Sequence, residues 1–151
     1  MGQRVEVLSQ PVRRSAKVFG ALSLSYNPRF SFAFAERFNA KTFLRFLKRL
    51  VNNSKRKILM VLDNVRYHHA RLVQEWVEAN SDRIELHFLP PYSPEFNPIE
   101  NLWRLTKRAT THNRHFATLK DLCDRLFRRF NRYQGNPASL RGLVRQFFEE
   151  A

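Results

Sequence analysis

Residues 58–63 read ILMVLD, a continuous apolar run that ends in the carboxylate of Asp63. An uninterrupted run of this length is typical of a strand that is buried on both faces, as in a parallel sheet. Asn64 follows at once, and ligand sites of open α/β sheets lie outside the carboxyl ends of their strands. Asp63 is therefore well placed to hold a metal ion. An Asp-Asn pair is also common in plain turns, and on these residues alone the turn is the favoured interpretation.

Upstream of this run, the sequence predicts strands and then a helix. Residues 3–8 alternate weakly and indicate an edge strand, whereas the alternation over 16–36 predicts a hairpin. One face of its first strand carries Val18, Leu22 and Leu24. Helical spacing predicts a helix over 40–52 that Asn39 can cap. Its apolar stripe consists of Phe43, Phe46, Leu47, Leu50 and Val51.

Downstream of Asp63, the pattern changes to helices that alternate with strands. A helix is predicted over 69–79, and a short buried strand over 84–89. The side chains expected to face inward from that helix are Leu72, Val73, Trp76 and Val77. Another helix should begin at Pro98, because Pro suits the first helical position and Asn97 suits the cap.

Two further helices complete the predicted order. Their apolar stripes are Leu119, Leu122, Cys123, Leu126, Phe127 and Phe130 in the first, and Leu140, Leu143, Val144, Phe147 and Phe148 in the second. The order of elements is typical of a single α/β domain over residues 1–151, with an antiparallel start and a parallel finish.

The composition indicates a globular protein that binds a polyanion. Hydrophobic residues make up 43% of the chain and charged residues 26%, which argues against disorder. There are 27 Lys and Arg against 13 Asp and Glu, so the net charge is +14 and nucleic acid is the natural partner. Cys123 is the only cysteine, and no apolar run approaches the roughly 18 residues of a membrane span. A cytosolic protein without a membrane partner is expected.

A second carboxylate stands out in the stretch LPPYSPEFNPIENLW, residues 89–103. Glu100 falls on the first turn of the helix predicted from Pro98, three residues after Asn97. This spacing is a capping box, which needs no catalytic role. The same position also holds a carboxylate firmly and points it toward neighbouring strand ends, so the two interpretations do not exclude each other.

Two motifs, LMVLDNVRYHHA at 59–70 and LPPYSPEFNPIENLWRLTKR at 89–108, resemble those of the mariner-type insertion-sequence transposases. GQRVEV, KVFGALS and FNAKTFLRFLKRLV further upstream are also similar to that family, so the resemblance covers nearly all of the chain. It implies a ribonuclease H-like mixed sheet flanked by helices and a catalytic triad of acids. By this match Asp63 is the second acid and Glu100 the third, and both are metal ligands.

The activity that this resemblance implies is DNA transposition, by metal-dependent cleavage and strand transfer of insertion-element DNA. Two divalent ions, Mg²⁺ or Mn²⁺, would lie about 3.5–4 Å apart and act on the attacking and leaving oxygens. Carboxylates suit this task because hard cations prefer oxygen ligands.

One part of the family pattern is missing. The family places its first catalytic Asp on the first, central strand of the sheet, whereas residues 1–62 contain no Asp, and Glu6 and Glu36 lie outside the motif. The resemblance therefore implies that the central strand and the first Asp are missing, together with the family's DNA-binding helix-turn-helix. Either residues 3–8 or another chain would fill the gap in the sheet. Two carboxylates should bind metal more weakly than three and catalyse poorly.

Whether the chain is an enzyme therefore stays open. It is either an impaired transposase core, from a split or decayed reading frame, or a non-catalytic DNA-binding remnant or accessory subunit. Its expected partners are element-end and target DNA, with a second copy or an upstream transposase fragment as protein partner. The resemblance implies a bacterial cytoplasmic protein that associates with the nucleoid when it binds DNA.

The residues expected to contact DNA are Asn64, His68, Arg104, Lys107 and Arg108. His68 either supports the local loop or contacts a phosphate, and a zinc site with His69 matches no common ligand spacing. Lys107 either reaches a phosphate or belongs to a solvated helix face. Four arginines of the next predicted helix, Arg125, Arg128, Arg129 and Arg132, add to this basic surface. Trp103 and Cys123 are expected in the core.

Overall fold

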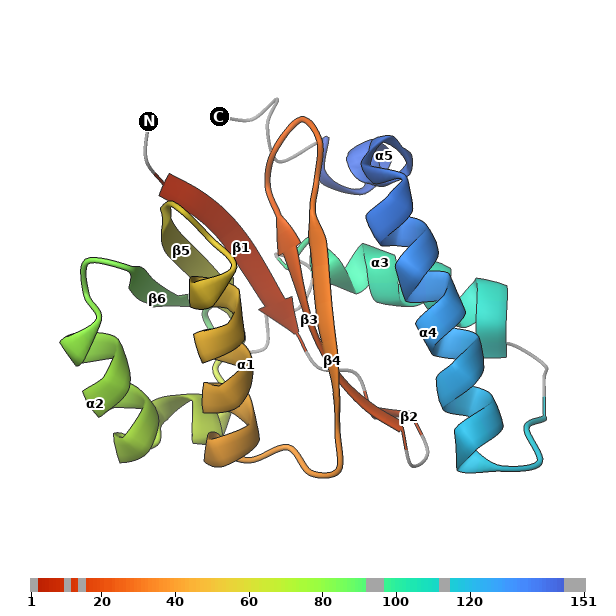
Figure 1. The fold of residues 1–151 in the computed structure, drawn as a ribbon, viewed down its shortest axis with the longest axis horizontal. Helices are drawn as coiled ribbons and strands as arrows, with labels where there is room; N and C mark the ends of the chain where they lie inside the picture. The colour runs from red at the N-terminus through yellow and green to blue at the C-terminus, as the bar shows by residue number, and fades with distance from the viewer. Residues whose placement is uncertain (1–2, 10–11, 14–15, 92–96, 112–114, 146–151) are drawn as a thin grey trace.

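The structure is a computed structural model that describes residues 3–9, 12–13, 16–91, 97–111 and 115–145 (Figure 1). Its strands are β1 (Gln3–Ser9), β2 (Val12–Arg13), β3 (Ala16–Ser23), β4 (Phe30–Ala35), β5 (Lys57–Leu62) and β6 (Ile84–Phe88). Its α-helices are α1 (Ala40–Asn52), α2 (Arg71–Ala79), α3 (Ile99–Thr106), α4 (Leu119–Gly135) and α5 (Arg141–Val144). Short 3₁₀ segments are η1 (Arg66–His69) and η4 (Pro137–Leu140), and η3 (Lys107–Thr111) is a π-helical turn.

The six strands form one mixed sheet, and β1 lies inside it. β1 pairs antiparallel with β3 on one side and parallel with β5 on the other. The prediction of an edge strand for residues 3–8 is therefore wrong. The sequence left open whether these residues or another chain would fill the central position of the sheet, and in the structure residues 3–9 occupy it. β4 pairs with β3 antiparallel, and β6 with β5 parallel, which confirms the antiparallel start and parallel finish.

Helices cover both faces of the sheet. α1 and α2 lie over one face and α3, α4 and α5 over the other (Figure 1). The hairpin β3–β4 contributes to both layers: Val18 and Leu22 pack toward α3 and α4, and Leu24 lies against the same cluster, as predicted. Phe19 packs on the opposite face, in the aromatic cluster with α1.

The strands around Asp63 are less buried than their apolar sequences suggest. In β5, Ile58, Met60 and Leu62 are fully buried under α1 and α2, while Val61 is only half-buried on the other face. The prediction of burial on both faces thus holds in part. β6 is the outer strand beside β5; only its first residue, Ile84, is buried, and Phe88 is 37% exposed, so the predicted burial of this strand is wrong beyond Ile84.

The predicted helix over 40–52 is confirmed as α1, together with its cap. Asn39 Oδ1 accepts a hydrogen bond from Thr42 N at 3.0 Å, and Thr42 Oγ1 accepts one from Asn39 N at 3.1 Å. The helix predicted near 69–79 is confirmed as α2, which begins two residues later than predicted, at Arg71, after η1 has ended at His69. Leu72 is 44% exposed, so its predicted inward orientation is wrong.

The two late helices are α4 and the combined η4 and α5. Of the predicted stripe of α4, Leu122, Leu126 and Phe130 are buried and Cys123 is half-buried. Leu119 and Phe127 are each 50% exposed, because they lie at the margin of the face that packs on the sheet. Leu140 and Val144 are buried, and the predicted positions Phe147 and Phe148 lie outside the described residues. None of the described helices is long and apolar enough to cross a membrane.

Candidate active site

Asp63 stands at the carboxyl end of β5, directly after the last paired residue of the strand. The strand is anchored there on its outer side, since Leu89 N donates to the carbonyl of Leu62 at 2.8 Å. Partial burial raises the pKa of the Asp63 carboxyl above its ordinary value, because a charge loses hydration there. A hydrogen bond from Asn97 opposes this effect and favours the ionised form.

Asn97 contacts both the side chain of Asp63 and the backbone of Glu100. Its side-chain amide donates to Asp63 Oδ1 at 3.3 Å, although 33 residues, including η1, α2 and β6, separate the two along the chain. Its Oδ1 accepts from Ile99 N at 3.3 Å, and its carbonyl accepts from Glu100 N at 3.1 Å. One buried side chain therefore ties the end of β5 to the first turn of the helix that carries Glu100.

The start of α3 is close to the predicted one. The helix is assigned from Ile99, and Pro98 already has helical angles, with φ −57° and ψ −27°. Glu100 is half-buried on the first turn, where the positive end of the helix dipole favours a carboxylate. The structure thus brings the backbone of Glu100 and the side chain of Asp63 to one buried residue, Asn97. That the two carboxylates share a metal ion stays a prediction.

His68 has a structural position. It is 1% exposed, its Nδ1 lies 2.9 Å from the carbonyl oxygen of Asp63, and its ring packs on Phe43 at 4.3 Å between centroids. Burial lowers the pKa of His68 to about 4, so the ring is neutral at pH 7 and donates from Nδ1. The expected phosphate contact of His68 is therefore wrong. Its other predicted role, support of the loop after β5, is the one that the structure shows.

The neighbouring polar residues are on the surface. Asn64 is exposed, and its Oδ1 forms a hydrogen bond with Nε2 of His69. The His69 ring stacks on Phe88 of β6, with 4.0 Å between ring centroids. Asn64 thus stays available beside Asp63, and its contact with DNA stays a prediction.

A basic surface continues from α3 into α4. Arg104, Lys107 and Arg108 are exposed, and the last two lie in the π-helical turn η3. The end of α3, directly before this turn, is held against α4 by a hydrogen bond between Thr106 Oγ1 and the hydroxyl of Tyr133 at 2.8 Å. Beside it, a cavity of about 310 Å³ is lined by Ala109, Thr110, Arg125, Arg128, Arg129 and Arg132.

Trp103 fixes the position of α3 on the sheet. It is 3% exposed, as predicted for a core residue, and lies directly over Gly20 of β3. A Cβ atom at Gly20 would stand 2.4 Å from Trp103 Cη2, so only glycine permits this approach. Gly20 is not among the residues predicted to position the site, although a glycine inside a well-formed strand is a known sign of close approach. Cys123 packs half-buried against the same cluster.

The place of a first acid can be judged from the register of β1. Glu6 pairs with Met60, three residues before Asp63, which is about 10 Å along a strand. Leu8 pairs with Leu62, so Ser9 is the residue of β1 that follows in step with Asp63. Within the described residues, no group of three or more His, Cys, Asp or Glu side chains is gathered for a metal ion. Asp63 and Glu100 offer the oxygen donors that hard divalent cations prefer, but they supply two carboxylates rather than three.

This arrangement, with a central strand that is antiparallel to one neighbour and parallel to the next and helices on both faces, is a ribonuclease H-like fold. It is similar to the catalytic core domain of BIV integrase, with a TM-score of 0.58 at 12% identity over 81% of this chain and 80% of that one. It is also similar to a chain of the simian T-cell lymphotropic virus intasome, with a TM-score of 0.57 at 13% identity over 83% of this chain and 47% of that one.

Residues 1–123 match the family described as DDE superfamily endonuclease, and the chain belongs to that family. The family generally uses divalent metal ions and acts on DNA. An insertion element IS630 39 kDa protein of Shigella sonnei is 30% identical over 82 residues, 53% of this chain and 24% of that protein. The protein y4pE/y4sA of Sinorhizobium fredii is 38% identical over 56 residues, 37% of this chain and 42% of that protein. The matches thus span less than half of either curated relative.

Proposed function

We propose that this chain supplies the second and third carboxylates, Asp63 and Glu100, of a DDE transposase core that cleaves and joins insertion-element DNA with Mg²⁺ or Mn²⁺. The observation that carries the proposal is the buried Asn97, whose side chain donates to Asp63 while its carbonyl receives the amide of Glu100. Family membership and the IS630 relative support a role in transposition. Residues 1–151 would form one catalytic domain.

Each part of the site has a task in this proposal. Asp63 and Glu100 would hold the divalent ions. When bound, these ions would polarise the phosphate and activate a water or a 3′-hydroxyl for in-line attack. Asn97 favours the charged form of Asp63 against the effect of burial. Neutral His68 fixes the Asp63 carbonyl without adding a positive charge beside the cations. Asn64, Arg104, Lys107 and Arg108 would contact the DNA backbone near the site.

The site is incomplete along β1, and this limits the activity that we expect. Neither Leu8 nor Ser9 offers a carboxylate at the level of Asp63, and Glu6 is too far back along the strand. We therefore propose weak metal affinity and slow cleavage for the chain alone. A protein partner, a second copy or an upstream transposase fragment, would supply the remaining oxygen ligands.

A second candidate is a DNA-binding accessory protein without catalysis. It is favoured by the missing acid of β1 and by the arginine-lined cavity beside η3, which needs no metal to attract phosphate. The two candidates differ in one property: cleavage requires divalent ions held by Asp63 and Glu100, whereas an accessory protein would bind DNA equally well with and without metal.

The test is nicking of supercoiled plasmid in Mn²⁺ or Mg²⁺, together with metal titration by calorimetry. Asp63→Asn keeps an oxygen to accept from Asn97 while it removes the charge, and Glu100→Gln does the same on α3. We expect each to lower nicking and metal affinity by at least about tenfold, as for changes at metal sites generally. The control Asp82→Asn removes an exposed acid in the turn after α2 and should change neither.

Nicking that survives both substitutions would overturn the catalytic proposal. Salt-sensitive DNA binding that is indifferent to metal, with no nicking at all, would establish the accessory role instead.

A further inference from the structure

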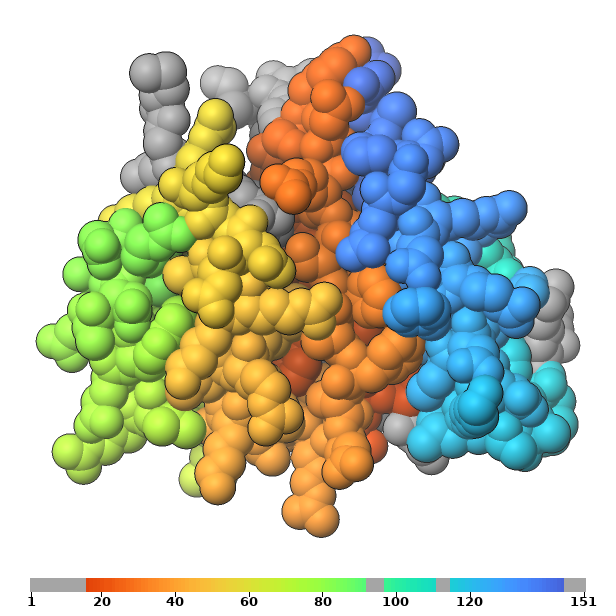
Figure 2. Space-filling view, viewed as in Figure 1, coloured from red at the N-terminus to blue at the C-terminus, as the bar shows by residue number. Residues whose placement is uncertain are grey.

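Two adjoining cavities run along the outer edge of β4, between α1 and the start of η4. One of about 650 Å³ lies between β4 and α1, and one of about 440 Å³ continues toward the β3–β4 turn and Gln134 of α4. Arg49 lines both, so the two form one continuous groove. In Figure 2 the orange hairpin is visible along this groove, between α1 in yellow and α4 in blue.

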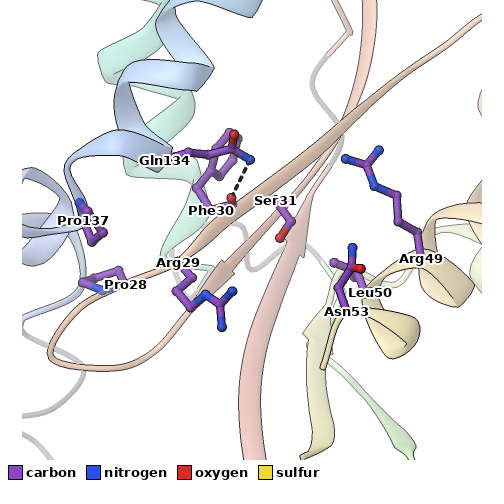
Figure 3. A pocket seen from close by; sticks show the side chains of 9 residues that line it. All are labelled: Pro28, Arg29, Phe30, Ser31, Arg49, Leu50, Asn53, Gln134 and Pro137. Carbon is purple, nitrogen blue, oxygen red and sulfur yellow. Dashed lines mark hydrogen bonds between the residues drawn. The ribbon is translucent and has the colours of Figure 1, made fainter. Parts of the chain in front are cut away.

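The groove is lined by five cations: Arg29, Arg37, Lys41, Arg45 and Arg49. Three of them stand four residues apart on α1, so they project from one side of the helix at steps of about 6 Å. Figure 3 shows Arg29 and Arg49 extending from the hairpin and from α1 toward the space between these elements. We refer to these five residues as the basic groove.

The charge of the basic groove is not neutralised by acids of the described residues. No ion pair involves any of the five cations within the described residues, and Glu36 is the one described acid that lines the cavities. Like charges four residues apart destabilise a helix, so the α1 stripe is costly without a counter-charge. An anion that spans several of these side chains would remove that cost.

The floor of the basic groove adds backbone donors. Ser23 N donates to the carbonyl of Arg29 at 2.9 Å, so alternation along the antiparallel pair turns the N–H and C=O groups of Phe30, Phe32 and Phe34 to the outer edge. The side-chain amide of Gln134 donates a hydrogen bond to the Phe30 carbonyl at 3.1 Å (Figure 3). The outward amides at Phe32 and Phe34 can donate to an anion, and backbone amides are common phosphate contacts.

We infer that the basic groove binds the phosphate backbone of DNA, at a place separate from the carboxylates. β4 is three strands from β5, which is about 14 Å across the sheet, and the turn at Arg29 lies at the opposite end of the strands from Asp63. The inference goes beyond the proposed cleavage, because it requires neither metal nor acids. Pairing of β4 with a second copy is disfavoured, since two sets of α1 cations would then face each other.

The test is the affinity for a fluorescent 20-base-pair duplex at several NaCl concentrations in EDTA. Arg45→Gln with Arg49→Gln removes two groove cations, and both positions are exposed, so the fold should persist. Lys48→Gln with Lys55→Gln is the matched control, because it removes the same charge from exposed positions that do not line the groove. Melting curves of both double variants check the fold.

We expect the groove variant to make the negative slope of log K against log[NaCl] shallower by about two. Its affinity should fall by about tenfold or more near 0.1 M salt, while the control variant changes the slope and the affinity far less. Equal losses in the two variants would overturn the inference, since net charge alone would explain them. So would unchanged DNA affinity with groove-dependent binding of poly-glutamate, which would assign the groove to an acidic protein. Asp63→Asn should leave the slope unchanged, so failure of the catalytic proposal would be recognised separately.

Discussion

Two neighbouring parallel strands, β1 and β5, end at the same edge of the sheet and yet differ in what they present there. β5 leads into Asp63, whose carboxyl is held by Asn97 and whose carbonyl is held by His68. β1 reaches the same level with Leu8 and Ser9, which offer no charge. The strands share a register, so the difference lies in the residues and not in the geometry of the sheet.

This difference separates two requirements, one for the sheet and one for a metal site. Completing the sheet requires only a strand with backbone donors and acceptors in register, and residues 3–9 satisfy that requirement. Completing a metal site requires a particular carboxylate at one position. A chain can therefore keep the fold of its family without a carboxylate on the central strand, and the following substitutions probe the fold and the site separately.

The largest effect is expected at His68, which anchors the end of β5. Its pKa falls from the ordinary 6.5 to about 4 in the fold, so the unfolded chain takes up a proton that the folded chain does not. Stability is complete above pH 6.5 and falls by about 3 kcal/mol as the pH drops toward 4. His68→Gln keeps an amide donor and should remove this fall. Urea unfolding in EDTA between pH 4 and 7 measures it, with exposed His87→Gln as control; equal pH profiles for wild type and His68→Gln would contradict the assignment.

The next effect concerns the packing of α3 on the sheet, at the strand beside β1. Gly20 pairs with Ser9, and Trp103 leaves no room for a Cβ atom above it. Gly20→Ala should destabilise the fold by about 2 kcal/mol through overpacking. Gly142→Ala is the control, because nothing lies within 4 Å of its added Cβ and alanine is the better helix former. A thermal midpoint for Gly20→Ala as high as that of the control would show that α3 does not pack as described.

A smaller effect is expected at Asn97. Asn97→Ala should cost about 1 kcal/mol, since it removes the bonds to Asp63 and to Ile99 N. It should also raise the pKa of Asp63 further, because the hydrogen bond that favours the charged form is lost. Carboxyl NMR titration measures the pKa. Asn39→Ala removes the cap of α1 at a similar cost and should leave the Asp63 pKa unchanged; a shift of that pKa in both variants would argue against a specific role for Asn97.

The smallest effect would come from giving β1 the acid that it lacks. Ser9→Asp should raise the affinity for Mn²⁺ a few-fold, as an added carboxylate beside two others does when a site tolerates the extra charge. Glu6→Gln should leave metal affinity unchanged, because Glu6 pairs three residues before the level of Asp63. If Glu6→Gln instead abolishes binding, β1 is displaced in solution from the register described here, and the comparison of the two strands fails.

Local sequence predicted the elements around Asp63 well. The run before Asp63 is β5, the Asn39 cap is in place, and α3 begins within one residue of Pro98. These features depend on side chains that act on their own neighbourhood, such as a capping amide or a proline that fixes φ. Local rules therefore suffice for them.

Features set by distant partners could not be predicted in the same way. The weak alternation of residues 3–8 says nothing of the two strands that enclose β1, and the burial of His68 depends on Phe43 of α1. Leu72 and Phe88 are apolar in sequence, yet they lie at the margins of the layers, where no further element covers them in the described chain. The role of Asn97 required the contact with Asp63, which no spacing rule could supply.

The parallel pairing of β1 with β5 also sets a timetable for folding during synthesis. Gln3 leaves the ribosome first, but its partner Lys57 follows more than fifty residues later, roughly 3–10 s at ordinary rates of translation. The antiparallel neighbour β3 arrives much earlier, so β1 first joins a three-stranded meander with β3 and β4 whose other edge stays open. During this interval β1 is an edge strand of the nascent sheet, with one side unpaired. That side becomes paired only when β5 is synthesised, and Asp63 follows β5 directly.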